Sequence, residues 1–227
     1  MQENTVVALY DTFRSAKEAV TEIVQAGGSR DHIAMLANDS TGDHPPLSIN
    51  PAWAREEFDT DSTSQSGIVT GAELGIGVGG ILGFLVGIGT IAIPGIGPLI
   101  ALGTWASVAA GATAGGVVGG VIGALTDRGV SDEDAHLYAE GLRRGGTLVT
   151  MVVPADQVDK MTQIFKKHGA VDIEKRNAHW TAEGWVSFDP DAEPLTPEQI
   201  AAAKARAAGH EAEHHQAVKS YPTPGGA

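Results

Sequence analysis

The stretch VVALYDTFRSAKEAVTEIVQAGG, residues 6–28, places a short β-type run, Val6–Tyr10, before a helical pattern that ends at a glycine. The apolar residues of the helical part recur at intervals of three and four: Phe13, Ala16, Ala19, Val20, Ile23 and Val24. Gly27 follows them, which is typical of a helix end. Another apolar run, Ile33–Ala37, comes after a short polar turn. The order strand, helix, strand predicts a βαβ unit.

The same pattern returns 142 residues later, so that Val6 corresponds to Leu148 and Gly27 to Gly169. Leu148–Val153 is the β-type run of this second unit, and its helical positions are Val158, Met161, Ile164 and Phe165. The run Ala170–Ile173 predicts a fourth strand. Two such units favour one four-stranded antiparallel sheet with helices on one face, the ferredoxin-like split βαβ fold of class α+β. Two independent fragments are the alternative, but two strands alone would not bury a core.

Composition sets the expected division of the chain. We expect a first βαβ half in residues 1–37, an acidic loop in 38–66 and a glycine-rich segment in 67–125. A helix with the second βαβ half follows in residues 126–188, and a linker with a tail helix in 189–227. Ser131 with three acidic residues after it predicts the start of the helix in the fourth part, which Arg143 and Arg144 end. The tail helix is expected over about Pro197 to Lys219, exposed and mobile.

The segment from Gly67 to Leu125 carries one formal charge, Glu73, and 18 of the 30 glycines of the chain. Small residues recur every four positions on both sides of the sequence IPGIGP, residues 93–98. This spacing predicts a helical hairpin whose packing residues are Gly67, Gly71, Gly75, Gly79, Gly83, Gly87, Gly103, Ser107, Gly111, Gly115, Gly119 and Gly123. Because each glycine disfavours a helix in water by about 1 kcal/mol relative to alanine, the hairpin requires close packing.

Two settings provide such packing. Each arm of about 25 residues is long enough, at about 1.5 Å per residue, to cross a hydrocarbon core of about 30 Å. In lipid, small residues every four positions let helices approach closely. We therefore expect a hairpin in the cytoplasmic membrane with both termini cytoplasmic, since a hairpin returns to its starting side and the first residues do not resemble a signal peptide. The alternative is a cytoplasmic, glycine-packed particle or filament of many copies.

Charge and residue types narrow the functional classes. A net charge of −13 disfavours nucleic-acid binding. The absence of cysteine removes thiolate nucleophiles and cysteine-ligated metals. Gly75–Gly80 satisfies GxGxxG but follows no β-type run, and His210 and His214 have no evident third metal ligand on the same face. We predict a protein that is not an enzyme and has no cofactor, metal site or identified small-molecule substrate.

Both halves of the chain resemble a known family. The first half is similar to the N-terminal domain of bacterial heat-induced general stress proteins, in the sequence VVALYDTFRSAKEAVTEIVQAGGSRDHIAML. The second half resembles the C-terminal stretch of their glycine-zipper-containing relatives, in the sequences GVSDEDAHLYAEGLRRGGTLVTMVV, HGAVDIEKRNAHW and GWVSF. The resemblance spans roughly residues 5–188. It implies a stress-associated bacterial protein without established enzymatic activity, and it offers no catalytic residues. The leading expectation is a homo-oligomer assembled through the hairpin; a small-ligand or metal-sensing domain is a further alternative.

Overall fold

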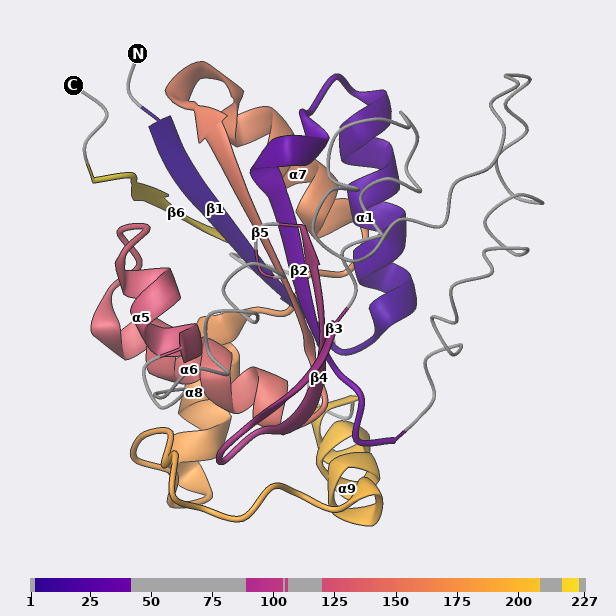
Figure 1. The fold of residues 1–227 in the computed structure, drawn as a ribbon, viewed down its shortest axis with the longest axis vertical. Coiled ribbons are helices and arrows are strands. Elements are labelled where there is room, and N and C mark those ends of the chain that lie inside the picture. Colours follow the sequence, from indigo (N-terminus) through magenta and orange to yellow (C-terminus); the bar gives the residue numbers. More distant parts are fainter. Residues whose placement is uncertain (1–2, 42–88, 104, 106–119, 209–217, 225–227) are drawn as a thin grey trace.

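A computed structural model of the chain describes residues 3–41, 89–103, 105, 120–208 and 218–224. Within these residues the protein is a mixed α/β structure with one six-stranded antiparallel sheet and six α-helices (Figure 1). The strands are β1 (Glu3–Tyr10), β2 (Ile33–Asn38), β3 (Gly89–Ile93), β4 (Gly97–Gly103), β5 (Thr147–Pro154) and β6 (Val218–Pro222). Their order across the sheet is β3-β4-β2-β5-β1-β6.

The centre of the sheet joins the two halves of the chain. Strand β5 pairs with β1 over its whole length, from Glu3↔Pro154 to Tyr10↔Thr147, and with β2 on its other side. Because β2 ends at Asn38 and β5 begins at Thr147, the chain between these neighbouring strands contains the entire glycine-rich segment. The glycine-rich segment therefore lies between two adjacent strands of one sheet and contributes β3 and β4 to that sheet.

Helices cover both faces of the sheet (Figure 1). Helices α1 (Phe13–Gln25) and α7 (Val158–Lys167) lie on one face, and α5 (Gly120–Thr126), α6 (Asp132–Arg143) and α8 (Ile173–Ala182) lie on the other. Alternate residues of β1 divide between two buried clusters, with Val6 and Ala8 in one and Val7 and Leu9 in the other, as the twofold periodicity of a strand requires. Helix α9 (Pro197–Ala208) lies at one end of the sheet.

The internal repeat is present in the structure. The span of α1, residues 13–25, corresponds at the offset of 142 to residues 155–167, which the short 3₁₀ turn Ala155–Gln157 and α7 fill together. Gly27 and Gly169 follow the two helices with φ angles of 95° and 77°, a backbone conformation that glycine adopts without strain. The strand–helix–glycine pattern read from the sequence is therefore confirmed in both halves.

The predicted helical hairpin is wrong for residues 89–103 of the glycine-rich segment, whereas residues 120–125, at the end of that segment, belong to helix α5. Residues 89–93 and 97–103 are β-strands, paired from Gly89↔Ala101 to Ile93↔Gly97, and β4 extends the sheet beside β2. The turn between them is at the predicted place. Its residues Gly95 and Gly97 have φ angles of 75° and 105°, so the same glycines that suggested a break between helices form a β-turn.

The predicted fourth strand is also wrong. Asp172 accepts hydrogen bonds from the backbone N–H groups of Glu174 and Lys175, and this N-cap begins α8 at Ile173. Only the N–H of Val171 reaches β1, where it donates to the carbonyl of Leu9 at 2.7 Å. The edge of β1 that the predicted strand would have occupied is paired instead with β6, from Asn4↔Pro222 to Ala8↔Val218.

The tail differs from its prediction as well. The helix begins at Pro197 as expected, but α9 ends at Ala208, and Lys219 lies in β6. The tail is not simply exposed, because Ile200 is 0% and Tyr221 is 9% exposed. The charged composition of the tail suggested an exposed segment, but these two side chains pack against the rest of the domain.

Two helical glycines provide a test of the packing. An alanine Cβ at Gly141 on α6 would lie 2.5 Å from Cδ2 of Leu9, a side chain only 2% exposed, whereas one at Gly123 on α5 meets nothing within 4 Å. We expect Gly141→Ala to lower the free energy of unfolding by about 1–2 kcal/mol, since overpacking outweighs the gain in helix propensity. Gly123→Ala should raise it by up to about 1 kcal/mol. Chemical denaturation followed by circular dichroism measures both, and a shift in the same direction would contradict the packing.

Candidate functional site

The β3–β4 hairpin is the longest described part of the glycine-rich segment, from which the sequence predicts assembly. Its side chains enter both buried clusters, with Ile93 and Leu99 in one and Ile100 and Leu102 in the other. The register Gly89↔Ala101 places the start of β3 beside the end of β4. The glycine-rich sequence continues on both sides of the hairpin, mainly in residues outside the described part of the chain.

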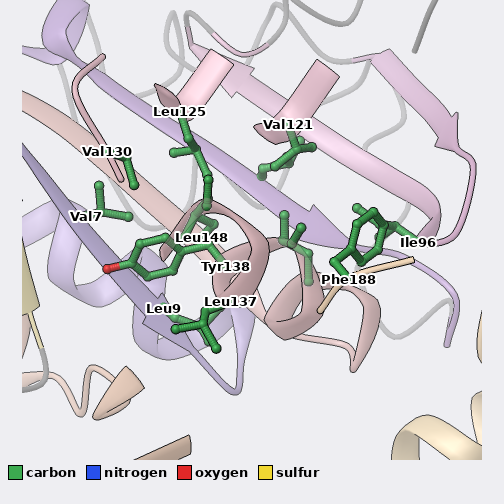
Figure 2. Packing of buried hydrophobic residues seen from close by; sticks show 14 of the residues in the cluster. Val7, Leu9, Ile96, Val121, Leu125, Val130, Leu137, Tyr138, Leu148 and Phe188 are labelled. Atoms are coloured by element: carbon green, nitrogen blue, oxygen red, sulfur yellow. The ribbon is translucent and has the colours of Figure 1, made fainter. Parts of the chain in front are cut away.

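The turn of the hairpin is held against the C-terminal half of the chain. A Cβ at Gly95 would lie 2.7 Å from the carbonyl oxygen of Asp189, and Ile96, which is 1% exposed, faces Phe188 (Figure 2). Asn38 fixes the neighbouring strand, because its Nδ2 donates to the carbonyl of Leu142 at 2.9 Å. The hairpin is thus part of the folded core at its turn as well as along its strands.

Of the predicted packing residues, two lie in the described part of the chain. Gly103 ends β4 with a φ of 67°, and Gly123 lies on α5. The other ten lie outside the described residues, namely Gly67, Gly71, Gly75, Gly79, Gly83, Gly87, Ser107, Gly111, Gly115 and Gly119. Glu73, the GxGxxG match and the histidines of the tail, His210, His214 and His215, lie outside them too.

A polar network that the sequence did not predict joins β6 to α6. The side chain of Asp134 accepts hydrogen bonds from Lys219 Nζ at 2.7 Å, from Tyr221 Oη at 2.9 Å and from Ser131 Oγ at 2.8 Å. Tyr138 Oη lies 3.5 Å from Tyr221 Oη. The Asp134 side chain is 11% exposed, so this network, termed here the β6 latch, is largely shielded from water.

Protonation in the β6 latch favours the ion pair. Burial opposes ionisation of Asp134, but the hydrogen bonds from Lys219, Ser131 and Tyr221 outweigh it and hold the pKa of Asp134 below its ordinary value. Burial likewise opposes the charge of Lys219, but Asp134 and Glu174 hold the pKa of Lys219 above its ordinary value. Burial raises the pKa of both tyrosines, which remain neutral donors at physiological pH.

These directions predict the pH dependence of the β6 latch. The lowered pKa of Asp134 gives stability that is complete above the unfolded value of about 3.9 and is lost as the pH falls through the folded value. The raised pKa of Lys219 gives stability that is complete below about 10.4 and is lost as the pH rises through the folded value. The difference in unfolding free energy between the wild type and Asp134→Asn should therefore be constant between about pH 5 and 9 and shrink below about pH 4. Urea titrations across this range measure it, and a steep change near pH 7 would contradict the assignment.

A second network connects α6, α8 and α9. Glu140, whose side chain is 1% exposed, accepts a hydrogen bond from Arg144 Nε at 2.7 Å. The guanidinium of Arg144 lies 4.8 Å from the centroid of the Trp180 ring and pairs with Glu183, which also pairs with Arg206 of α9 at 3.0 Å. The ion pairs of Arg144 and its contact with the Trp180 ring therefore connect the three helices where they meet.

Several aromatic and basic residues of the second half have structural partners. Trp180 on α8 and Trp185 just after it form an edge-to-face pair at 5.8 Å. Arg176 is 9% exposed and forms a two-point ion pair with Asp11. Lys167 pairs with Glu22 of α1 at 2.8 Å.

Within the described parts of the chain, no three His, Cys, Asp or Glu side chains converge on a possible metal site. None of the helices in those parts has the length and apolar character needed to cross a bilayer.

The chain matches no model of a known protein family, no curated protein and no solved structure.

Proposed function

We propose that this is a non-enzymatic, stress-associated protein that self-assembles into a homo-oligomer through its glycine-rich segment. The observation that supports this most directly is the root of the β3–β4 hairpin. Gly89, the first residue of β3, pairs with Ala101, and β4 ends two residues later at Gly103. The end of the first glycine-rich arm and the beginning of the second are therefore connected to neighbouring strands of one sheet.

Charge also supports assembly through this segment. Copies with a net charge of −13 repel one another, and the repulsion is weakest where charge is absent. Residues 67–125 carry only Glu73 as a formal charge. Close approach of small residues permits backbone contact between segments that bulkier side chains would prevent. Association of copies through this segment joins the least charged part of the sequence.

Between the two settings expected from the sequence, the hairpin geometry favours association with other copies over a bilayer. A hairpin that crossed a membrane with its turn at residues 93–98 would place that turn on the side opposite both halves of the chain. In the structure the turn lies against Phe188, and its strands belong to the sheet of both halves. We therefore propose the glycine-packed particle or filament as the assembled form.

The strand order supports a ferredoxin-like origin for the domain. Strands β6, β1, β5 and β2 are adjacent and antiparallel in the arrangement that the split βαβ fold requires, with β6 in the position of the fourth strand. In this proposal β3 and β4 are an addition beside β2. The resemblance to glycine-zipper-containing general stress proteins, which motivates the stress-associated role, involves the same two halves.

The test is a fourfold replacement, Gly75, Gly79, Gly115 and Gly119 to leucine, measured by light scattering of the full chain. We expect the variant to lose the large assembly of the wild type, because leucine prevents close backbone approach. The matched control places four leucines beside the small-residue rows, at Ile76, Val78, Val117 and Val118, and should retain the assembly. Unchanged size in the glycine variant overturns the proposal. Retention of the wild type in membranes after carbonate washing would favour the bilayer setting instead.

A further inference from the structure

Strand β3 forms one edge of the sheet. Within the part of the chain that the structure describes, β3 pairs with β4 alone, and β6 forms the opposite edge. A strand at the edge of a sheet has backbone N–H and C=O groups along one side that can pair with a further strand. The two edges of this sheet differ in how well they are protected against such pairing.

The edge at β6 has features that oppose pairing with another chain. β6 contains the charged residue Lys219 and also Pro222, which has no backbone N–H. Natural proteins use both residue types to keep edge strands apart. β3 contains neither a charged residue nor a proline, and residues 89–103 as a whole carry no formal charge. The edge at β3 therefore lacks these safeguards.

The backbone groups on the outer side of β3 belong to Thr90 and Ala92. Pro98 of β4 lies opposite Ala92, and its carbonyl oxygen accepts a hydrogen bond from the N–H of Asp39 at 2.9 Å. The backbone of Pro98 thus faces the β2 side of β4. Because opposite residues of an antiparallel pair exchange either both hydrogen bonds or neither, the N–H and C=O of Ala92 face away from β4. The direction alternates along a strand, so Thr90 faces the same way.

The spacing of these two residues makes the edge of β3 complementary to itself. When two copies of β3 lie antiparallel about a twofold axis at Ile91, Thr90 of each copy lies opposite Ala92 of the other. Both pairs can then exchange N–H···O=C bonds, so that every outward backbone group of the two strands has a partner. Ala92 is exposed and has a small side chain, which leaves room for this approach.

Charge favours a second copy of the chain as the partner of this edge. The uncharged hairpin offers neither an acidic nor a basic peptide an electrostatic attraction. Copies with a net charge of −13 repel one another least where charge is absent. β3 also lies within residues 67–125, the segment through which the proposed function brings copies together.

We propose that two copies of this chain pair through β3, antiparallel and centred on Ile91, so that their two sheets become continuous. The inference rests on the proposed self-assembly, but the contact is made by backbone hydrogen bonds and not by the rows of small residues. A twofold contact of this kind closes at two copies. The protected edge at β6 ends the joined sheet on both sides, so the product is a pair and not a growing sheet.

The test of the register is a disulfide between copies. The chain has no cysteine, so a single introduced cysteine can form a disulfide only with another copy. Opposing Cα atoms at Ile91 would lie about 4.5 Å apart, which a disulfide spans. Ala92→Cys is the matched control, because the two copies of that position would lie about 7–8 Å apart, beyond a disulfide. On mild oxidation of the full chain we expect Ile91→Cys to form linked dimers at least about tenfold faster than Ala92→Cys, measured by non-reducing electrophoresis.

A proline at position 92 tests the backbone hydrogen bonds. Ala92→Pro removes an N–H that points away from β4, so the substitution is compatible with the sheet of its own copy. Ala92→Ser is the control that keeps the N–H. Combined with Ile91→Cys, Ala92→Pro should slow dimer formation about tenfold, whereas Ala92→Ser should leave the rate unchanged. Circular dichroism of each variant establishes that it is folded.

Three results would overturn the edge pairing: no linked dimer from Ile91→Cys, equal rates for Ile91→Cys and Ala92→Cys, or no effect of Ala92→Pro. Slow hydrogen exchange of the Thr90 and Ala92 amides in the isolated monomer would also overturn it, because a segment of the same chain would then occupy the edge. If Ile91→Cys forms no dimer while the fourfold leucine variant loses the large assembly, only the edge pairing fails. If Ile91→Cys forms the dimer while the leucine variant keeps its size, only the glycine packing fails.

Discussion

Replacing Asp134 with alanine is expected to lower the free energy of unfolding by about 3–5 kcal/mol. The substitution removes the acceptor of three hydrogen bonds at once and leaves the Lys219 ammonium group without its closest carboxylate. Removing one partner of a largely buried ion pair costs more than the pair contributes, because the remaining charge stays in a poorly solvated position. Urea denaturation followed by circular dichroism at neutral pH measures the effect.

Asp132→Ala is the matched control for this prediction. Asp132 lies in the same first turn of α6, so both substitutions remove one favourable charge from the helix N-terminus, worth about 0.3–1 kcal/mol. The Asp132 side chain is 80% exposed, and the nearest basic nitrogen, on His136, is 3.8 Å away. The control should therefore lose no more than the helix-dipole contribution. Equal losses for the two variants would show that the β6 latch adds nothing to stability.

The parts of the fold that sequence reasoning predicted correctly depend on local signals. Helix α6 begins where Ser131 caps the backbone N–H of Asp134, and it ends before Gly145, which has a φ of 90°. The repeat of strand, helix and glycine was recognised because both copies have the periodicity of their own secondary structure. Such features require only residues within a few positions of one another.

The prediction for residues 89–103 of the glycine-rich segment is wrong because pairing with β2, a tertiary contact, decides their structure. A four-residue spacing of glycines fits a helix, but Thr90, Ile91 and Ile93 are β-branched residues, which favour strands. The free edge of β2 provides backbone partners from Ala34↔Gly103 to Asn38↔Leu99, so β4 forms there. β-Branched residues beside a turn with two glycines were a signal for a β-hairpin that could have been recognised in the sequence.

The β6 latch could not be predicted from a single sequence. Asp134 and Lys219 are 85 residues apart, and no local pattern relates them. Strand β6 contains only five residues, two of them Lys219 and Pro222, and its composition resembles the polar tail around it. Only the sheet order brings such groups together.

The second large effect is expected at Gly129, in the turn between α5 and α6. This residue has a φ of 89°, and a Cβ placed on it would collide with the carbonyl oxygen of Pro222, the last residue of β6. Gly129→Ala therefore incurs both the left-handed backbone penalty, about 1–2 kcal/mol, and a clash with a backbone atom, about 1–3 kcal/mol. A carbonyl in a paired strand cannot rotate away as a side chain does, so the clash is relieved by displacing β6. We expect a loss of about 2–5 kcal/mol and faster hydrogen exchange at the β6 amides.

Gly169→Ala separates the two contributions. Gly169 has a φ of 77°, but a Cβ there meets nothing within 4 Å, so the substitution should cost only the backbone term of about 1–2 kcal/mol. Its β6 amides should exchange as slowly as those of the wild type, since a Cβ at Gly169 would touch no atom of β6. If Gly129→Ala and Gly169→Ala lose equal stability and both leave β6 protected, the turn after α5 does not hold β6, and of the two contacts only the hydrogen bonds from Lys219 and Tyr221 to Asp134 do so. If only Gly129→Ala releases β6, the strand is held at both ends: by the Asp134 carboxylate through Lys219 and Tyr221, and by the backbone fit of Pro222 against Gly129.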